Sequence, residues 1–195
     1  VKPTKYVAAS GGNILFIGNM TTAQNLASLE FIVHKVLPLL KLGKSVLKVV
    51  GKFDERAIKI VGNATNVDLL GFVDDLGSVV SECSVALMPV AFGTGVKTKV
   101  LDSLAMGVPV VTNFVGAEGL AIESGVQALI AESEADLALS VMRILQDRNL
   151  SRSLALCGRD YVINHHSHAN LKRKYNEVIK SSLILGGEHD RASSV

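Results

Sequence analysis

Short apolar runs alternate with longer amphipathic segments along the chain. The runs are rich in β-branched residues and apolar nearly throughout, which is typical of strands buried on both faces of a sheet. They predict strands at residues 13–18, 45–51, 67–71, 84–90, 108–113 and 127–131. Strands that alternate with helices indicate an α/β fold, here a Rossmann-like three-layer α/β/α arrangement with about six parallel strands.

Segments with a helical period of hydrophobicity lie between these runs. They predict helices at residues 25–40, 54–61, 74–83, 96–106 and 134–147, and a further helical stretch over 150–183 that is broken near 164–168. We expect residues 1–12 to form a linker or N-terminal arm, 13–183 one Rossmann-like domain, and 184–195 a disordered tail.

Composition narrows the class of protein. The chain has 195 residues, of which 48% are hydrophobic and 19% charged, as in one ordinary globular domain. Its 20 basic and 18 acidic residues are scattered, which argues against a nucleic-acid partner. Because the sequence shows neither an apolar run of membrane-spanning length nor a signal peptide, we expect a cytoplasmic protein, peripheral to a membrane at most.

The cysteines and histidines do not form a recognisable metal site. Cys83 and Cys157 lie in helix-like contexts without further ligands at suitable spacing, and we expect free buried thiols. His165, His166 and His168 are expected to be solvated at a break in the last helix. The sequence therefore predicts neither a metal nor a cofactor.

The stretch FGTGVKTKVLD, residues 92–102, has the composition of an anion-binding turn. Gly93 and Gly95 tolerate positive φ and leave no Cβ in the way of a ligand, and the following helix would direct free N–H groups at the same point. Neither the Walker loop nor the dinucleotide fingerprint fits, because a Lys-Thr pair does not follow Gly95 directly and Thr98 stands where a third glycine is needed.

A packing role remains open for the same turn. In this interpretation the glycines only join a strand to a helix, Lys97 and Lys99 are solvated, and Lys99 pairs with Asp102 at a spacing of i,i+3.

The pattern as a whole resembles the nucleotide-binding C-terminal domain of family 4 retaining glycosyltransferases, which have the two-domain GT-B architecture. The resemblance covers roughly residues 13–183 and rests on the order of six blocks: ILFIGNM with Asn25 shortly after, VLPLL, KVVGK, LLGFVDDL, VALMPVAFGTGVKTKVLDSLAMGVPVVTN and GAEGL. Any one of these blocks alone would be a weak signal.

The resemblance implies a donor site at matching positions. Asp102 matches an acidic residue that binds the ribose hydroxyls, where the family usually has Glu. Thr94 stands where many members have a Glu that contacts the sugar, which weakens that role for Thr94. In relatives with a glycine-rich turn, the amides of Thr94, Gly95 and Val96, beside Gly93, would hold the diphosphate.

The remaining candidate residues follow other strands. The family often has an Arg and a Lys after its first strand, whereas the loop that begins with Gly18 and Asn19 has neither, so Lys97 or Lys52 is expected to supply the charge. The backbone of Phe72 and Val73 matches a loop that meets the nucleobase. Alternatively their side chains pack into the core and Asp74 caps the next helix; Glu118 is expected to be a turn or cap residue rather than a sugar ligand.

The function implied by the resemblance is hexosyl transfer from a UDP- or GDP-sugar, without a cofactor, to an unknown acceptor, as in polysaccharide biosynthesis. The catalytic residues stay unknown. Because the chain has room for the donor half only, we expect a part of a longer enzyme that is inactive alone, and its partners to be the nucleotide-sugar donor and the N-terminal GT-B domain. The donor domain of a sugar-nucleotide epimerase and a non-enzymatic partner-binding module are the open alternatives.

Overall fold

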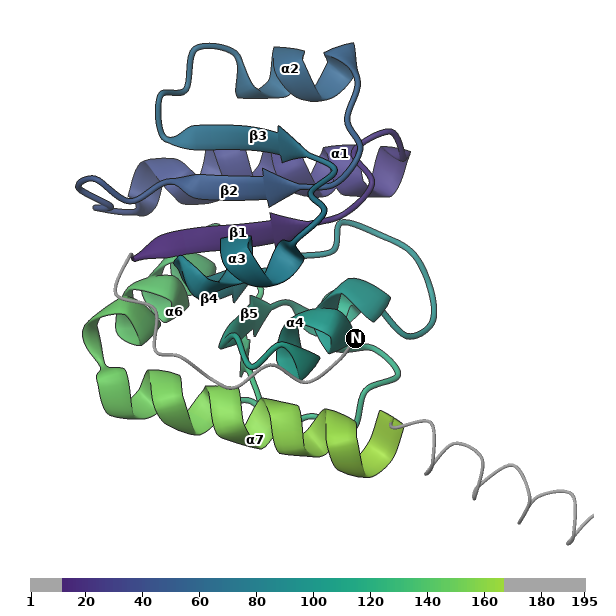
Figure 1. Cartoon of the computed structure of the whole chain (residues 1–195), viewed down its shortest axis with the longest axis vertical. Coiled ribbons are helices and arrows are strands. Elements are labelled where there is room, and N and C mark those ends of the chain that lie inside the picture. The colour runs from purple at the N-terminus through teal and green to yellow at the C-terminus, as the bar shows by residue number, and fades with distance from the viewer. Residues whose placement is uncertain (1–11, 167–195) are drawn as a thin grey trace, which may run out of the picture.

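The computed structural model describes residues 12–166 and shows a three-layer α/β/α fold around one parallel sheet (Figure 1). The strand order is β3-β2-β1-β4-β5-β6, and every pairing is parallel. The strands are β1 (Asn13–Ile17), β2 (Leu47–Val50), β3 (Val67–Gly71), β4 (Cys83–Leu87), β5 (Val110–Thr112) and β6 (Leu129–Ile130). The predicted Rossmann-like class and all six predicted strands are confirmed.

The sheet is buried as its apolar sequence predicts. Ile14, Leu15 and Phe16 of β1 are fully buried on both faces, and so are Val85 and Leu87 of β4. These two central strands are neighbours in the sheet although β2 and β3 lie between them in the sequence. From them the chain winds outward in both directions, which places the reversal of strand order between β1 and β4.

Helices cover both faces of this sheet. In Figure 1, α1 and α6 lie behind the sheet, α3 and α4 lie in front of it, and α7 packs against α4 and α6 at the lower edge. The helical elements are α1 (Ala23–Phe31), η1 (Ile32–Val36), η2 (Leu37–Leu39), α2 (Glu55–Val61), α3 (Leu76–Ser81), α4 (Thr98–Ala105), α5 (Phe114–Ala117), α6 (Glu134–Gln146) and α7 (Arg148–His166).

The first predicted helix is helical over most of its length but changes type along the way. An α-helix, α1, passes into a π-helical turn, η1, and then into a short 3₁₀ turn, η2. Pro38 lies in η2; it has no N–H to continue the α-helical ladder and its ring crowds the carbonyl four residues earlier. A second difference is α5, a four-residue helix capped by Asn113 that the sequence pattern did not predict.

The third helix is shorter than predicted. Asp75, not Asp74, caps α3, because its side chain accepts a hydrogen bond from the backbone N–H of Ser78 at 3.2 Å. The helix ends at Ser81, so Cys83 begins β4 rather than ending a helix. Burial raises the pKa of the Cys83 thiol to about 12, which is the behaviour expected of an inert buried cysteine; Cys157 is also free but only half-buried.

The last described helix can be followed into the predicted break as far as residue 166, and the rest of that stretch lies outside the described residues. Residues 164–166 are part of α7, and Tyr161 contacts both histidines there: its ring stacks on His165 at 4.9 Å and its hydroxyl lies 3.1 Å from Nε2 of His166. His168, the helix expected up to residue 183, the N-terminal arm before residue 12 and the C-terminal tail lie outside the described residues. Among the described helices, none is both long enough and apolar enough for a membrane span.

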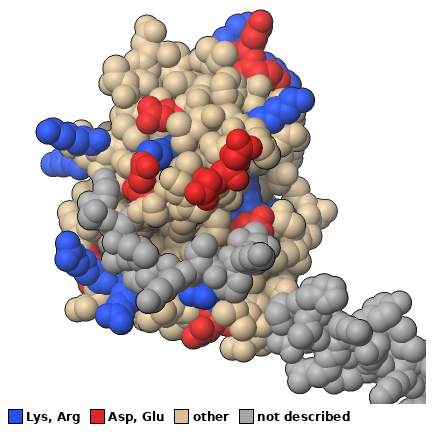
Figure 2. Space-filling view, in the orientation of Figure 1, with Lys and Arg blue, Asp and Glu red and all other residues tan. Residues whose placement is uncertain are grey.

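Charged side chains are dispersed over the face shown in Figure 2. Lysine and arginine alternate with acidic residues there, and neither sign gathers into a patch on this face. The scattered charge of the sequence is therefore also scattered in space on this side of the molecule.

Candidate functional site

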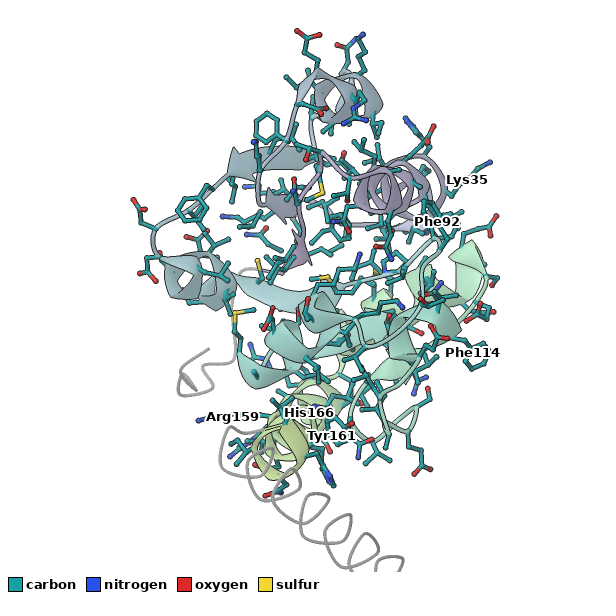
Figure 3. All side chains as sticks on the ribbon, turned by 90° about the vertical axis from the view of Figure 1, so that its right-hand side faces the viewer. Lys35, Phe92, Phe114, Arg159, Tyr161 and His166 are labelled. Atoms are coloured by element: carbon teal, nitrogen blue, oxygen red, sulfur yellow. The ribbon has the colours of Figure 1, made fainter. Side chains whose placement is uncertain are left out.

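The loops that the sequence predicts for ligand binding lie at one edge of the sheet. In Figure 1 the arrows of β1, β2 and β3 point to the right, and Figure 3 looks onto that right-hand side. Gly18 follows β1, Gly71 ends β3 and the glycine turn at residues 93–97 follows β4. Because all strands are parallel, these three positions share the carboxyl edge, where open α/β sheets bind ligands.

The glycine turn presents its backbone to solvent. Gly93 and Gly95 have φ of 117° and 77°, a region that other residues adopt only with strain. Thr94, Gly95 and Val96 are exposed, and within the described residues their backbone N–H groups donate no hydrogen bond. A Cβ on Gly95 would meet no atom within 4 Å. The turn therefore leaves open space beside unused donors, which is the arrangement that an anion needs.

Lys97 holds this turn in shape. Its Nζ donates to the carbonyl oxygens of Gly93 at 3.1 Å and Gly95 at 2.6 Å, and it lies 3.3 Å from Oε2 of Glu118. Only 7% of Lys97 is exposed, so the packing interpretation is wrong in expecting a solvated Lys97. With its donors occupied by the loop, Lys97 closes the turn rather than reaching out of it.

The segment after α5 supports the turn from the other side. Besides the ion pair of Glu118, a Cβ on Gly119 would lie 3.1 Å from Cγ2 of Val96, so the two backbones pack closely. Glu118 also ends α5, in agreement with the expected turn or cap role, but its contact with Lys97 was not predicted. Gln24 adds a second support, because its side-chain amide donates to the carbonyl of Phe92.

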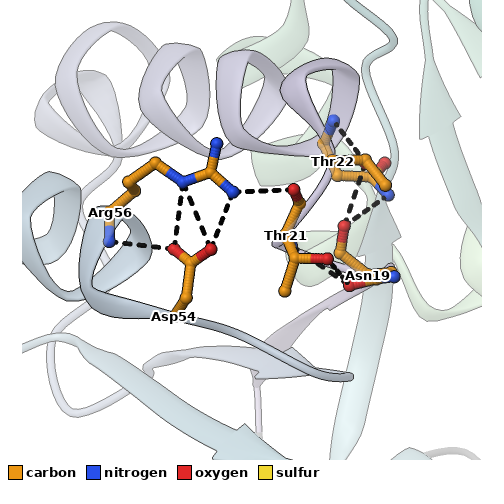
Figure 4. Close-up of polar contacts among 6 residues, drawn as sticks. Asn19, Thr21, Thr22, Asp54 and Arg56 are labelled. Atoms are coloured by element: carbon orange, nitrogen blue, oxygen red, sulfur yellow. Dashed lines mark hydrogen bonds and ion pairs between the residues drawn. The ribbon is translucent and has the colours of Figure 1, made fainter.

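The loop after β1 is fixed by its own polar groups. The side-chain oxygen of Asn19 accepts hydrogen bonds from the backbone N–H and the hydroxyl of Thr21, at 3.1 and 2.8 Å (Figure 4). The backbone carbonyl of Asn19 accepts a third hydrogen bond, from Nδ2 of Asn25 at 3.1 Å. The side chain of Asn19, a predicted ligand-binding residue, is thus used within the loop. Its neighbour Gly18 lies so close to Gly51 that a Cβ on Gly51 would overlap the Gly18 carbonyl oxygen.

Arg56 ties this loop to the one after β2. Its guanidinium donates to the carbonyl of Thr21 at 2.8 Å and pairs with Asp54 at 2.7 Å (Figure 4). Asp54 also caps α2, and the hydrogen bonds from Arg56 lower the pKa of this carboxyl. Two neighbouring loops of the carboxyl edge are therefore joined by one side chain.

Lys99 lies at the centre of this edge. From the first turn of α4 its Nζ donates to Oδ1 of Asn25 in α1 at 3.0 Å and lies 5.1 Å from the centre of the Phe16 ring in β1. Burial, and then the charge of Lys97, lower the pKa of Lys99 to about 8. The packing interpretation predicted an ion pair between Lys99 and Asp102. This prediction is wrong, because no such pair occurs among the described residues.

Asp102 lies one turn further along α4. It is half-buried, and burial raises the pKa of its carboxyl above the ordinary value. No hydrogen bond to its carboxylate is found within the described residues, although its backbone carbonyl accepts from Met106. The carboxylate therefore keeps its acceptor capacity for a ligand hydroxyl.

The other predicted site residues lie at the same edge with their side chains in different settings. Phe72 is 84% exposed, so the alternative that its side chain packs into the core is wrong, whereas Val73 is partly buried against the core. The backbone of Lys52 accepts a hydrogen bond from Met20 at 2.7 Å, and its side chain is exposed. Phe92 and Phe114 also reach the surface on the side seen in Figure 3, with 52% and 67% exposed.

Metal ligation finds no geometric support in the part of the chain that the structure describes. No three His, Cys, Asp or Glu side chains of residues 12–166 lie close enough together to hold an ion. The groups discussed for this site are the backbone N–H donors of the turn, the basic side chains at the carboxyl edge and the carboxylate of Asp102.

Solved structures share this fold. A mutant of S. aureus TarM in complex with fondaparinux, α-GlcNAc-glycerol and UDP superposes with a TM-score of 0.72 and 15% identity, over 90% of this chain and 37% of that one. The C-terminal domain of LpcC, a glycosyl transferase group 1 family protein from Francisella tularensis, superposes with a TM-score of 0.65 and 17% identity, over 86% of this chain and 96% of that domain. At these identities the likeness establishes the fold.

Sequence comparison identifies the family. An uncharacterised 44.6 kDa protein in the cps region of Klebsiella pneumoniae is 23% identical over an aligned length of 180 residues, and the match covers 87% of this chain and 46% of the relative. The chain thus spans about half the length of this curated relative. The family model described as "Glycosyl transferases group 1" matches residues 11–147, more than half of the chain, with the glycine turn and Asp102 inside the match. The chain belongs to the group 1 glycosyltransferases.

Proposed function

We propose that this chain is the part of a retaining glycosyltransferase that binds the donor, a sugar linked to a nucleoside diphosphate. The observation that carries the proposal is the glycine turn: exposed N–H groups of Thr94, Gly95 and Val96 donate no hydrogen bond within the described residues and border open space. Such donors suit phosphate oxygens. Asp102, half-buried on the helix that follows, is a suitable acceptor for ribose hydroxyls.

UDP is the first nucleotide to test, and GDP the second. The TarM structure with the same fold contains UDP, which supports a uridine donor here without deciding the base. Phe72 follows β3, the edge strand that pairs with β2, and its side chain is exposed. It is therefore available at the end of the site that we propose for the nucleobase. A stacked aromatic ring accepts either base.

The chemistry of the full-length enzyme follows from this arrangement. The bond from the anomeric carbon to the diphosphate oxygen breaks, and the diphosphate leaves with the electron pair while its charge is stabilised by the turn. An acceptor hydroxyl oxygen forms the new bond to that carbon, and its proton passes to the departing diphosphate or to solvent. We propose a hexosyl donor and an acceptor that lies in a growing polysaccharide; the cps region of the Klebsiella relative is consistent with this acceptor.

The acceptor site belongs, in this proposal, to an N-terminal domain of the same enzyme. The chain covers 46% of the Klebsiella relative, which leaves room there for a second domain of similar size. We therefore expect the isolated chain to bind nucleotide weakly and to transfer no sugar, because closure by the second domain is missing.

Calorimetric titration of this chain with UDP and GDP tests the proposal. We expect saturable binding of at least one of them, and weaker binding of the corresponding monophosphate because it lacks one phosphate group. The proposal would be contradicted if no nucleoside diphosphate gave either a heat of binding or a thermal shift. With full-length protein, release of nucleoside diphosphate only in the presence of an acceptor separates a transferase from an epimerase.

A further inference from the structure

A cation close to the oxygens of a bound diphosphate would add to what the backbone N–H groups of the turn offer, and the loop after β1 supplies none. Residues 18–22 of that loop contain neither Lys nor Arg. The basic side chains that the structure places near the carboxyl edge come from Lys52, Arg56, Lys97 and Lys99. Which of them is available for a ligand can be decided from their contacts.

Two of the four are already engaged. Lys97 donates to two carbonyls of the turn and pairs with Glu118, so its charge is compensated within the protein. Arg56 pairs with Asp54 and donates to the carbonyl of Thr21. Lys52 follows β2, one strand away from the centre of the sheet, and its side chain is exposed, where a single charge is strongly screened.

Lys99 differs from these three residues in its contact partners and in its position at the edge of the sheet. Its ammonium group has a neutral hydrogen-bond partner, Asn25 Oδ1 at 3.0 Å, and an aromatic neighbour, Phe16, and no carboxylate of the described residues pairs with it. It joins the first turns of α4 and α1, the helices that follow the central strands β4 and β1. This is the position between the two diverging crossovers where ligands bind to such sheets.

Asn25 links this charge to the loop after β1. The same side chain that accepts from Lys99 donates through Nδ2 to the carbonyl of Asn19 at 3.1 Å. Asn25 thereby positions the Lys99 ammonium group between the loop that begins at Gly18 and the glycine turn. The turn, residues 93–97, ends two residues before Lys99. Since Lys99 is half-buried, its charge is less screened than that of a surface lysine.

We infer that Lys99 is the cation that binds the diphosphate of the donor, in place of a basic residue in the loop after β1. The inference rests on the proposed function and extends it by naming the residue that carries the positive charge. Asn25 is the positioning residue of this lysine, and Lys97 shapes the turn.

The titration of Lys99 gives the inference a distinct signature. The groups that face it are Asn25 from α1 and Phe16 from β1, both uncharged, with Lys97 before it and Asp102 after it in its own segment. In the free protein the amine loses its proton as the pH rises through about 8, whereas the phosphates of UDP are fully ionised above about pH 7. The affinity for UDP should therefore fall above pH 8.

UDP titrations of the chain between pH 7 and pH 9.5 test this. We expect Lys99→Gln to weaken UDP binding about tenfold or more at pH 7, the size of one lost charge-assisted hydrogen bond, and to remove the pH dependence. Lys99→Arg, which stays charged, should bind without loss above pH 8. Lys41→Gln, an exposed lysine before β2, is the matched control and should behave as wild type.

The outcomes separate the two proposals. Wild-type binding that is equally strong at pH 7 and pH 9.5, or a folded Lys99→Gln variant with wild-type affinity, would overturn the role of Lys99 and leave the nucleotide site in place. Where Lys99→Gln does not fold, Lys99→Arg decides the matter, because it keeps the charge and should keep its affinity above pH 8 where the wild type loses affinity. A wild-type chain without affinity for UDP or GDP would contradict the proposed function, and the inference with it.

Discussion

The ammonium group of Lys97 lies 3.3 Å from the carboxylate of Glu118, across the gap between the loop after β4 and the end of α5. The lysine is 7% exposed while the Glu118 side chain is 51% exposed. Lys97, the buried member of this pair, also donates hydrogen bonds to the turn. The contact therefore matters mainly through what it does to the carbonyls of Gly93 and Gly95.

Lys97→Met should destabilise the chain and disorder the turn. The substitution keeps the buried aliphatic stem but leaves two carbonyls without their donor, a loss of roughly 1–3 kcal/mol in the free energy of unfolding. Glu118→Gln should cost less than about 1 kcal/mol, because that carboxylate is half-exposed. Urea denaturation of both variants checks the order. Equal, small losses would show that Lys97 is dispensable for the turn.

Gly95→Ala should reduce diphosphate binding far more than it reduces stability. A Cβ there meets no protein atom within 4 Å, so the folding cost is the positive φ alone, about 1–2 kcal/mol, while the methyl group occupies the space proposed for a phosphate. Gly125→Ala is a matched control with φ of 89° and the same open surroundings, in the loop before β6. Calorimetry with UDP should show a loss for the first variant only; equal affinities would place the phosphate elsewhere.

Asp102→Asn should leave the fold intact and weaken nucleotide binding. A carboxyl whose folded pKa is raised stabilises the fold below its unfolded pKa, and this contribution is lost as the pH rises through the folded pKa. At pH 7 the buried carboxylate is thus unfavourable, and the amide should melt at the same temperature or higher. Binding should fall by roughly 1–3 kcal/mol.

The ribose supplies the control for Asp102. The wild type should prefer ribonucleotides to 2′,3′-dideoxynucleotides, and Asp102→Asn should lose that preference. A lower melting temperature together with unaltered binding would instead make Asp102 a structural residue.

Gly51→Ala should disrupt the carboxyl edge. Gly51 has φ of 125°, and an added Cβ would overlap the backbone oxygen of Gly18, which no rotamer change relieves. We expect a loss of more than about 3 kcal/mol in the free energy of unfolding. Gly43→Ala, at φ of 59° with no atom within 4 Å of the new Cβ, should lose only about 1–2 kcal/mol. Losses of the same size at both positions would show that the close approach of the two loops carries no energy.

The sheet could be predicted from sequence because its strands are apolar on both faces. Runs such as the one containing Ile14, Leu15 and Phe16 have few alternatives to a buried parallel strand, and turn residues separate them. The type of helix after β1 was less accessible, since the π and 3₁₀ turns that precede and include Pro38 depend on packing as well as on the missing N–H.

The polar contacts of the site could not be predicted from spacing along the chain. Lys99 and Asp102 have the i,i+3 spacing of a helical ion pair, yet Lys99 bonds Asn25, 74 residues earlier. Lys97 contacts Glu118 across 21 residues. Tertiary structure brings such residues together, and a single sequence contains no signal that identifies the pairs. What the sequence did indicate was the edge, because glycines at strand ends mark close backbone approach.

The binding of UDP by the glycine turn is the central claim, and amide chemical-shift mapping tests it most directly. In ¹H–¹⁵N spectra of the chain titrated with UDP, we predict saturable shifts for the N–H groups of Thr94, Gly95 and Val96, with smaller shifts near Gly18. Saturable shifts confined to the opposite edge of the sheet, around Ser45 and Asn66, or unchanged spectra with both UDP and GDP, would contradict the account.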